Sequence, residues 1–237
     1  MRDIYEPSNS IYCYPNTEVL RNKLNIKDIK KLQIYEAKIT AAKSLGLRKK
    51  GITGDFDVKH IKQIHKYLFE DIYPFAGEFR TENIAKGEFR FAQSEYIEPE
   101  LENLLNKLKK ENYLEGLDKK ELAIKLAYYL AELNVLHPFR EGNGRTNREF
   151  IRQLALKNGY KLDLKKVKAE QILEASIESI VNTDKLENII YQCLNEKENL
   201  KWGVQKHPFN IMSKNVKILV YNRYVTLKYK KGNTNMI

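Results

Sequence analysis

Hydrophobic residues recur three and four positions apart over most of the chain, which predicts helices joined by short connections. The stretch from Glu121 to Leu136 shows the pattern most clearly, with apolar residues at Leu122, Ile124, Leu126, Tyr129, Leu130, Leu133 and Leu136. This spacing is typical of a helix that is buried over a broad face. Pro138 would end the helix near His137, and a second helix would run from about Asn143 to Asn158-Gly159. The two helices therefore flank a short loop.

Capping residues and apolar spacing predict further helices on both sides of this pair. Asn25 would cap a helix that reaches about Leu45, and Asp28 would be an acid of its first turn. The inward face of this helix would be formed by Ile29, Leu32, Tyr35, Ile39 and Ala42. The other predicted helices run from Asp57 to about Phe69, Pro99 to about Lys110, Ala169 to Val181 and Asp184 to Leu194. Alternating residues over about 83–92 predict a β-hairpin instead. The predicted fold class is mainly α.

The net charge of +11 over 237 residues is unevenly distributed. Residues 201–237 contain eight Lys or Arg and no Asp or Glu, so residues 1–200 carry only +3. We expect one main domain over residues 1–199 and a basic extension over residues 200–237. Lys217 to Lys230 is rich in β-branched and aromatic residues, so the extension would form a small β element or be disordered. It would attract nucleic acid, anionic lipid or an acidic protein, or be a solvated surface; the chemistry below does not require nucleic acid.

Cysteine content and the absence of long apolar runs indicate the compartment. Cys13 and Cys193 are too few for a disulfide framework or a zinc site, which favours a reducing setting. The opening residues MRDIYEPSNS lack the apolar core of a signal peptide, and no run approaches the roughly 18 apolar residues that span a bilayer. We expect a soluble, cytoplasmic protein without a membrane span. Export into a host cell by a specialised secretion system stays open.

The loop between the two best-defined helices carries the chemistry, because His137 to Arg148 reads HPFREGNGRTNR. Gly142 and Gly144 would let the backbone approach a ligand, and the helix N-terminus behind them would attract an anion. Arg145 and Arg148 lie three positions apart on one helix face, and arginine forks match phosphate oxygens. These residues predict a site for a nucleoside triphosphate.

Glu141 and His137 would supply the reactive groups of this site. A carboxylate beside phosphates is repelled unless a hard cation stands between them, so we interpret Glu141 as a ligand of Mg²⁺. His137 suits the removal of a proton from an incoming hydroxyl. A lone His-Pro pair is more often structural, and Lys206 to Asn210 (KHPFN) repeats it without the partners. The joint occurrence of all partners at His137 favours nucleotidyl or phosphoryl transfer to an alcohol.

The run resembles HPFx[D/E]GNGRxxR, the signature of the Fic family, with every fixed position present. Members mostly transfer AMP from ATP to a hydroxyl side chain of a target protein. The resemblance extends over roughly residues 5–195, because Asn83 to Phe91 (NIAKGEFRF) is similar to the family's hairpin flap. Tyr12 to Leu24 is similar to the opening of members found as bacterial toxins and secreted effectors. The resemblance implies a Fic-type helical bundle with a short β-hairpin flap.

The resemblance also implies a role for each residue of the motif. His137 would deprotonate a Tyr, Thr or Ser hydroxyl, and Glu141 would hold Mg²⁺ between the α- and β-phosphates of ATP. The others would bind phosphates: Gly142, Asn143 and Gly144 the α- and β-phosphates, Arg145 the β-phosphate and Arg148 the γ-phosphate. Phe139 would anchor the loop in the core. The phosphorylating branch of the family has Lys in place of Gly144, so AMP transfer is the preferred reaction.

Two alternatives concern how a target would dock and how the enzyme would be inhibited. Lys86, Gly87, Glu88 and Phe89 of the flap would bind an extended target segment by strand addition, or the flap would only cover the nucleotide. Thr183 to Asn188 (TDKLEN) fits the family's inhibitory pattern [S/T]xxxE[G/N], in which Glu187 would pair with Arg148. We favour the interpretation that Thr183 is an ordinary N-cap and that a separate small antitoxin protein inhibits.

Two other functions stay in view beside AMP transfer to a protein. An enzyme of the same fold would use another nucleotide or remove AMP from its target. A binding module would capture a partner through the tail or the flap, with nucleotide only stabilising the fold.

Overall fold

The computed structural model describes residues 10–196 except residue 88, and these fall into two units. The first contains the described residues up to Tyr113 together with Glu132–Leu154; the second contains Leu114–Ala131 and the residues from Ala155 onward. Helices α4 (Lys119–Leu136) and α5 (Asn143–Lys157) each contribute to both units. The predicted extension over residues 200–237, with its strands and its second His-Pro-Phe, lies outside the described residues.

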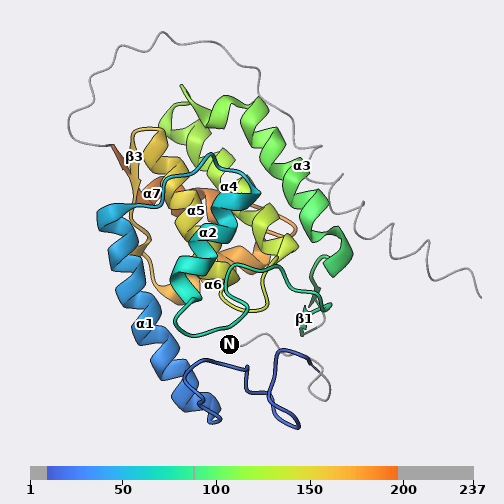
Figure 1. Ribbon diagram of the computed structural model, residues 1–237. Coiled ribbons are helices and arrows are strands. Elements are labelled where there is room, and N and C mark those ends of the chain that lie inside the picture. Colours follow the sequence, from blue (N-terminus) through green and yellow to red (C-terminus); the bar gives the residue numbers. More distant parts are fainter. Residues whose placement is uncertain (1–9, 88, 197–237) are drawn as a thin grey trace, which may run out of the picture. The chain divides into compact units, whose positions relative to one another are not determined.

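Three helices form much of the first unit. Helix α1 (Ile29–Lys50) and helix α2 (Val58–Phe69) are capped by the carboxylates of Asp28 and Asp57. The cap predicted at Asn25 is wrong, because this residue has φ +51, whereas an N-cap residue is usually extended. Helix α3 (Ile97–Lys110) follows a 3₁₀ turn over Ser94–Tyr96. Helix α2 packs against both α1 and α3, as Figure 1 shows. The predicted helices are therefore confirmed, although α1 continues beyond the expected end near Leu45.

The inward face predicted for α1 is partly wrong. Tyr35 is 44% exposed and Ala42 is also exposed, whereas Glu36 and Thr40 are buried. The prediction counted only apolar residues as inward. A polar side chain can be buried when it has a hydrogen-bond partner, and both residues bind a side chain of the motif helix described below.

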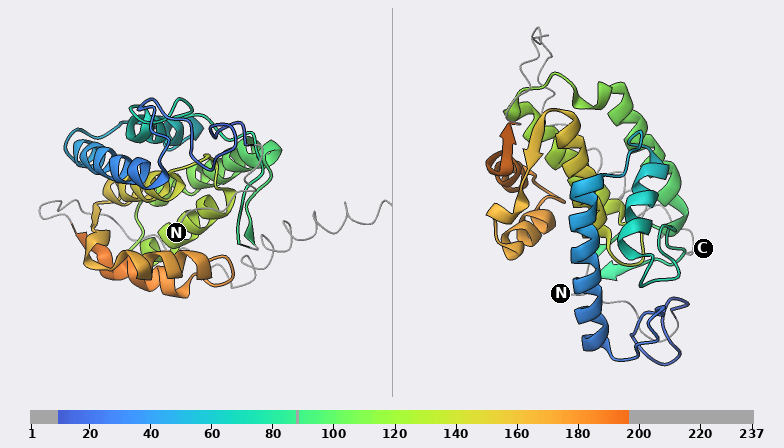
Figure 2. Two further views of the ribbon diagram at one scale, coloured as in Figure 1. Left: turned by 90° about the horizontal axis from the view of Figure 1, so that it is seen from below. Right: turned by 60° about the vertical axis from the view of Figure 1, so that its left-hand side comes forward.

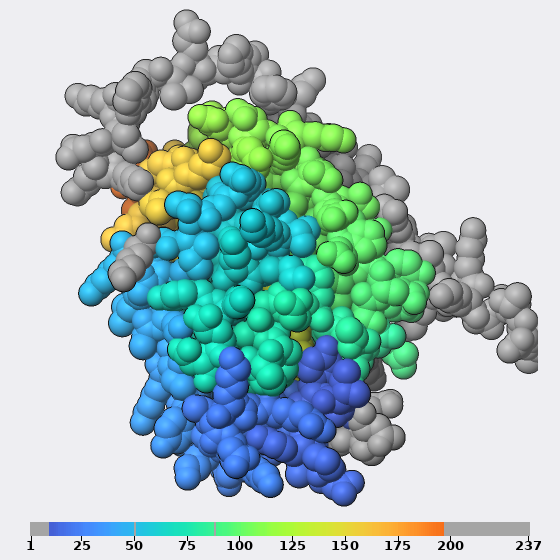
Figure 3. All heavy atoms as spheres, in the orientation of Figure 1, coloured from blue at the N-terminus to red at the C-terminus, as the bar shows by residue number. Residues whose placement is uncertain are grey.

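The N-terminal segment is fastened to the chain before the flap. Cys13 and Leu20 form an antiparallel bridge that folds this segment back on itself. The carboxylate of Glu82 accepts hydrogen bonds from the Ser10 hydroxyl and the Ile11 N–H, both at 2.7 Å. In Figure 3 the dark blue atoms of this segment meet the teal atoms of the following strand region. The segment thus supports the base of the hairpin.

The predicted flap is a short antiparallel hairpin. Strand β1 (Ala85–Lys86) pairs with strand β2 (Phe89–Arg90), with Lys86 opposite Phe89. Gly87 has φ +58 at the tip, a conformation that glycine adopts at little cost. The pairing continues below the strands through a bond from the Phe91 N–H to the Ile84 carbonyl.

The second unit contains helix α6 (Ala169–Glu178), helix α7 (Asp184–Cys193) and a small sheet. Strand β3 (Tyr160–Leu162) pairs antiparallel with strand β4 (Leu194–Glu196), and the right-hand view of Figure 2 shows the two arrows side by side. The sequence analysis did not predict this sheet, because three residues are too few to show alternation. Among the described residues, no helix is long and apolar enough to cross a membrane.

Glu132, in the last turns of α4, is expected to lower stability above neutral pH. Burial raises the pKa of its carboxyl to about 7; Lys107 opposes this rise and Glu100 adds to it. Between about pH 4.5 and 7 the folded protein therefore keeps a proton that the unfolded chain has lost. The contribution of Glu132 to stability falls as pH rises through this range. The change Glu132→Gln should therefore stabilise the protein more at pH 8 than at pH 4.5. The difference between the two effects on the free energy of unfolding should be up to about 3 kcal/mol.

Denaturant unfolding of both proteins at the two pH values checks this prediction. The exposed carboxylate of Glu98 offers a control, since Glu98→Gln should change stability by about 0.5 kcal/mol or less at either pH. An effect of Glu132→Gln that is the same at pH 4.5 and pH 8 would contradict the assignment.

Candidate active site

The motif loop is closed on itself by one side chain. Asn143, the first residue of α5, is buried; its Oδ1 accepts from the Phe139 N–H at 2.8 Å, and its Nδ2 donates to the Phe139 carbonyl at 2.7 Å. Both ends of the amide therefore hold the loop main chain. Because the side chain is used in this way, Asn143 has mainly its backbone N–H to offer a ligand.

A buried histidine supports the loop from below. The ring of His65 stacks on Phe139, with centroids 3.8 Å apart and planes at 9°. Its Nε2 donates to the Glu141 carbonyl at 2.9 Å, and its Nδ1 accepts from the Gly77 N–H at 2.8 Å. Burial lowers the pKa of His65 to about 3, so the ring is neutral and each nitrogen has a fixed role. His65 therefore has a structural role: it holds the main chain at Glu141.

His137 lies at the start of the motif loop, immediately after α4. Its imidazole stacks on Phe91 of the flap with centroids 3.8 Å apart, and its Nδ1 lies 3.3 Å from the Asn134 carbonyl. A carbonyl only accepts hydrogen bonds, so Nδ1 carries the proton in the neutral ring and Nε2 has the lone pair. His137 therefore has the tautomer that a general base acting through Nε2 requires.

The motif loop ends at the N-terminus of α5, whose first N–H groups have no acceptor within the helix. Gly142 has φ +83, and a Cβ there would lie 2.2 Å from the ring of Phe69. At Gly144 a Cβ would lie 3.0 Å from Nη1 of Arg148, so this guanidinium reaches back over the start of the helix. Gly142 is thus required by its conformation and by close approach, whereas at Gly144 the contact is with the end of a flexible side chain.

The two arginines of the motif have different surroundings. Arg145 donates to the Glu36 carboxylate at 2.6 Å and to the Thr40 hydroxyl at 3.1 Å, and it lies over the Phe69 ring. Arg148 is half-buried, and the described residues of this unit give it no hydrogen-bond or ion-pair partner. Burial, and then the charge of Arg145, lower the pKa of Arg148. An anion would relieve both effects.

Glu141 lies in the loop between His137 and the N-terminus of α5. Its Oε1 accepts from the Gly142 N–H at 2.8 Å and is 3.5 Å from Nη2 of Arg145. The side chain is 20% exposed, so its carboxylate borders the surface where a ligand would bind. An oxygen donor beside a helix N-terminus is the type of group that holds a magnesium ion bound to phosphates.

The structure brings the motif residues to one loop and adds partners that the sequence analysis missed. Glu36 and Thr40 bind Arg145, the Tyr73 hydroxyl donates to Glu36, and Phe91 stacks on His137. These contacts join positions up to 109 residues apart. No local spacing in the sequence signals them, although a glutamate on the inward face of a helix is unusual enough to suggest a partner.

The residues predicted for target docking belong to the first unit, and the residue predicted for inhibition belongs to the second. Lys86 and Phe89 form the pair nearest the flap tip, and Glu88 lies outside the described residues. In the second unit, the Thr183 hydroxyl donates to the Glu187 carboxylate at the start of α7. This bond joins two side chains, and Thr183, although it is the N-cap residue by position, makes no side-chain capping hydrogen bond to the backbone of α7.

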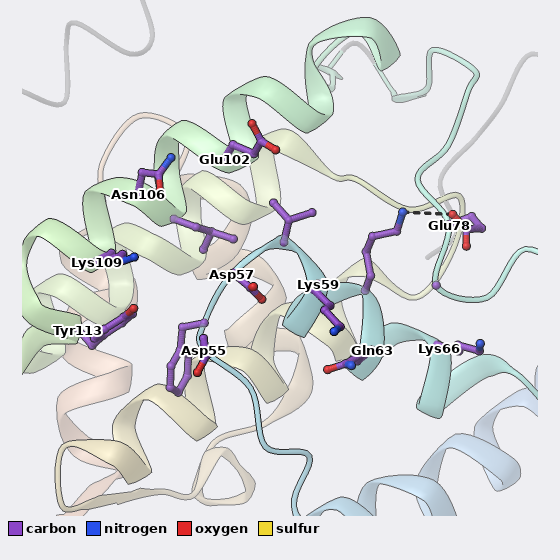
Figure 4. A pocket seen from close by; sticks show the side chains of 15 residues that line it. Asp55, Asp57, Lys59, Gln63, Lys66, Glu78, Glu102, Asn106, Lys109 and Tyr113 are labelled. Carbon is purple, nitrogen blue, oxygen red and sulfur yellow. Dashed lines mark ion pairs between the residues drawn. The ribbon is translucent and has the colours of Figure 1, made fainter.

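A hollow of about 950 Å³ between α2 and α3 is separate from this loop (Figure 4). Its lining has four lysines, Lys59, Lys62, Lys66 and Lys109, and four acidic residues, Asp55, Asp57, Glu78 and Glu102. Lys62 and Glu78 pair at 3.1 Å, which is the dashed line in Figure 4. The charges balance and none of residues 137–148 lines the hollow, so the loop is the better candidate site.

The sequence is similar to known proteins of one family. Residues 55–155 match the model of the Fic/DOC family. The chain is 43% identical over 193 residues to the protein adenylyltransferase VbhT of Bartonella schoenbuchensis, which covers 81% of this chain and 40% of VbhT. It is 36% identical to the probable protein adenylyltransferase Fic of Escherichia coli, over 72% of this chain and 84% of that protein.

Solved structures of bacterial effector proteins have a fold similar to that of this chain. The BepC effector of Bartonella tribocorum with bound AMPPNP superposes with a TM-score of 0.73 at 27% identity, over 79% of this chain and 97% of that one. The Fic domain of a Bartonella quintana effector with bound ADP gives 0.74 at 30% identity, over 79% and 95%. With residues 55–155 matching the family model and the helical fold matching these solved structures, the chain belongs to the Fic/DOC family.

Proposed function

We propose that this chain is a protein adenylyltransferase, which transfers AMP from ATP to a Tyr, Thr or Ser hydroxyl of a target protein. One observation carries the proposal: a histidine whose Nδ1 is turned to a carbonyl, and an arginine to which the described residues give no partner, lie at the two ends of one loop at a helix N-terminus. The names of the relatives agree with it. The chain spans 40% of the length of VbhT, so the target of the whole protein is part of the proposal.

The reaction would be a displacement at the α-phosphorus. The target oxygen attacks this phosphorus while its proton passes to Nε2 of His137. The bond from the α-phosphorus to the bridging oxygen breaks, and pyrophosphate leaves. The product is a phosphodiester between AMP and the target side chain, and His137 afterwards releases the proton to solvent.

The phosphates would be bound along the start of α5. The N–H groups of Asn143 and Gly144 have no acceptor within the helix and suit the α- and β-phosphates. The Gly142 N–H donates to Glu141 and so contributes through the shape of the turn. Arg148, to which the described residues give no partner, would bind the γ-phosphate, and Arg145, held by Glu36, would reach the β-phosphate.

The residues present also fit a magnesium ion. Glu141 offers a partly exposed carboxylate beside the phosphate site, and Mg²⁺ uses one or two carboxylates together with phosphate oxygens. When bound, the ion would neutralise negative charge on the α- and β-phosphates. Arg145, at 3.5 Å from Glu141, would keep this carboxylate in position.

The flap is the proposed docking element for the target. Its strands are two residues long, and a target segment that pairs beside Lys86, Gly87, Glu88 and Phe89 would extend the hairpin. Phe91 follows β2 directly and contacts the His137 ring. A hydroxyl presented from such a segment would therefore reach the base. The target would be met in a cytoplasm, either that of the producing cell or, after export, that of a host.

The position of the transferred label tests the reaction type. We expect label from α-labelled ATP, and none from γ-labelled ATP, to appear on proteins of a cell lysate incubated with the chain and Mg²⁺. Label from the γ-position would show phosphoryl transfer, and labelling only by another nucleotide would change the substrate.

A Glu187→Gly variant run in parallel decides how the enzyme is inhibited: stronger labelling assigns inhibition to Glu187, and equal labelling leaves it to a separate antitoxin protein.

A further inference from the structure

Arg80 is a buried arginine whose guanidinium is surrounded by main-chain carbonyls. The residue is 2% exposed. Its Nε donates to the His137 carbonyl at 2.8 Å, and its Nη1 donates to the Glu82 carbonyl at 2.7 Å. Its Nη2 donates to the carbonyls of Ala92 and Leu136. A group that is desolvated to this extent, with four such bonds, fixes the carbonyls that it contacts.

The four carbonyls belong to three different segments of the first unit. Glu82 precedes β1 and Ala92 follows β2, so one guanidinium joins both arms of the flap at its base. Leu136 and His137 form the C-terminal end of α4, where a cation also meets the negative end of the helix dipole. The main chain adds two bonds in parallel, from the Arg80 N–H to the Pro138 carbonyl and from the Ala92 N–H to the Val135 carbonyl.

The conformation of His137 needs this support. Its φ is +46, in the left-handed region that residues with a side chain seldom occupy. The direction of its carbonyl, and hence the direction in which the imidazole leaves the chain, is held by Arg80. The ring itself is held by Phe91, one residue before Ala92 on the same flap arm. Two constraints on His137 therefore come from the base of the flap, beside the contact of its Nδ1 with the Asn134 carbonyl of α4.

We propose that Arg80 is a positioning residue for the general base, which makes the flap and His137 move as one body. The inference rests on the proposed function, because it assigns a role in the same reaction. A target segment that docks on the flap then also sets the position of Nε2, so that docking and proton removal are coupled. The phosphate-binding residues are outside this linkage, because Asn143, Arg145 and Arg148 have no bond to Arg80 among those described.

Steady-state kinetics of Arg80→Lys and Arg80→Gln test the coupling. A displacement of about 1 Å costs on the order of 10²-fold in rate, so we expect kcat to fall about 10²-fold in Arg80→Gln and less in Arg80→Lys. The KM for ATP and the ATP dissociation constant should stay within about 3-fold. Arg21→Lys is the matched control, since Arg21 also donates to a main-chain carbonyl, that of Cys13, and should retain the wild-type kcat. An unchanged kcat in Arg80→Gln, or an equal loss of ATP binding, would overturn the proposal.

A spectroscopic measurement separates this proposal from the proposed function. Correlation spectra of the imidazole nitrogens, assigned for His137 with a His137→Ala sample, should show the single Nδ1–H tautomer in the wild type. In Arg80→Gln they should show a broadened average of both tautomers, whether or not AMP is transferred. If Arg80→Gln fails to fold, Phe91→Leu, a change at a half-buried position, takes its place and should give the same broadening. An unchanged His137 spectrum in the variants that fold would reject the role of Arg80.

Discussion

Replacing His137 by alanine is expected to reduce the rate of AMP transfer by roughly 10²–10⁴-fold while ATP still binds. The loss follows from removal of the proposed general base, whose Nδ1 is turned to the Asn134 carbonyl so that Nε2 is the nitrogen that would accept the proton. Binding should persist because the amides of α5 and the guanidinium of Arg148 are untouched. Initial rates with α-labelled ATP and calorimetric titration with ATP measure the two quantities separately.

The chain contains its own control for this variant. His207 lies in a second His-Pro-Phe that lacks the acid, the glycines and the arginines, so His207→Ala should leave the rate unchanged. A His137→Ala protein that still labels its target at the wild-type rate would remove the general-base assignment. If it also kept its activity in cells, the binding-module alternative would gain support.

Replacing Gly142 by alanine is expected to abolish ATP binding and to destabilise the fold by about 3 kcal/mol or more. Two costs add at this position. The residue has φ +83, which disfavours any side chain, and a Cβ would lie 2.2 Å from Cζ of Phe69. Relief of the contact would displace the turn that carries Glu141 and the N-terminus of α5. Denaturant unfolding and calorimetric titration with ATP report the two effects.

Gly116 allows the two costs to be separated. It has φ +85 with nothing within 4 Å of an added Cβ, so Gly116→Ala should cost only about 1 kcal/mol. The remainder at Gly142 is the contact with Phe69, and Phe69→Ala combined with Gly142→Ala should be less destabilising than the sum of the two single changes. Equal costs at Gly116 and Gly142 would show that the contact with Phe69 is unimportant.

The helices and the motif loop could be predicted because their signals are local. Asp28 and Asp57 are followed directly by the helices that they cap, and Pro138 ends α4 where the apolar spacing stops. The run from His137 to Arg148 likewise contains both reactive groups and both glycines. In each case the physical cause and its effect lie within a few residues of each other.

The support of the site could not be predicted, because its causes are distant in the sequence. Glu36 is buried only because Arg145 supplies a counter-charge from 109 positions away. Arg80 is buried because four carbonyls from three segments converge on it, and a sequence does not reveal convergence of this kind. The sheet of β3 and β4 escaped for a different reason, since its strands are shorter than the period needed to recognise them.

The amide of Asn143, tied to Phe139 at both ends, has a consequence for the speed of substrate capture. The bend between α4 and α5 has its final shape before any triphosphate arrives, because side chains of the protein fix it. Little conformational entropy is then lost on association, and no slow rearrangement of this bend delays it. Capture of the nucleotide should accordingly be a single fast encounter, which leaves the arrival of the second substrate as the step that sets the pace.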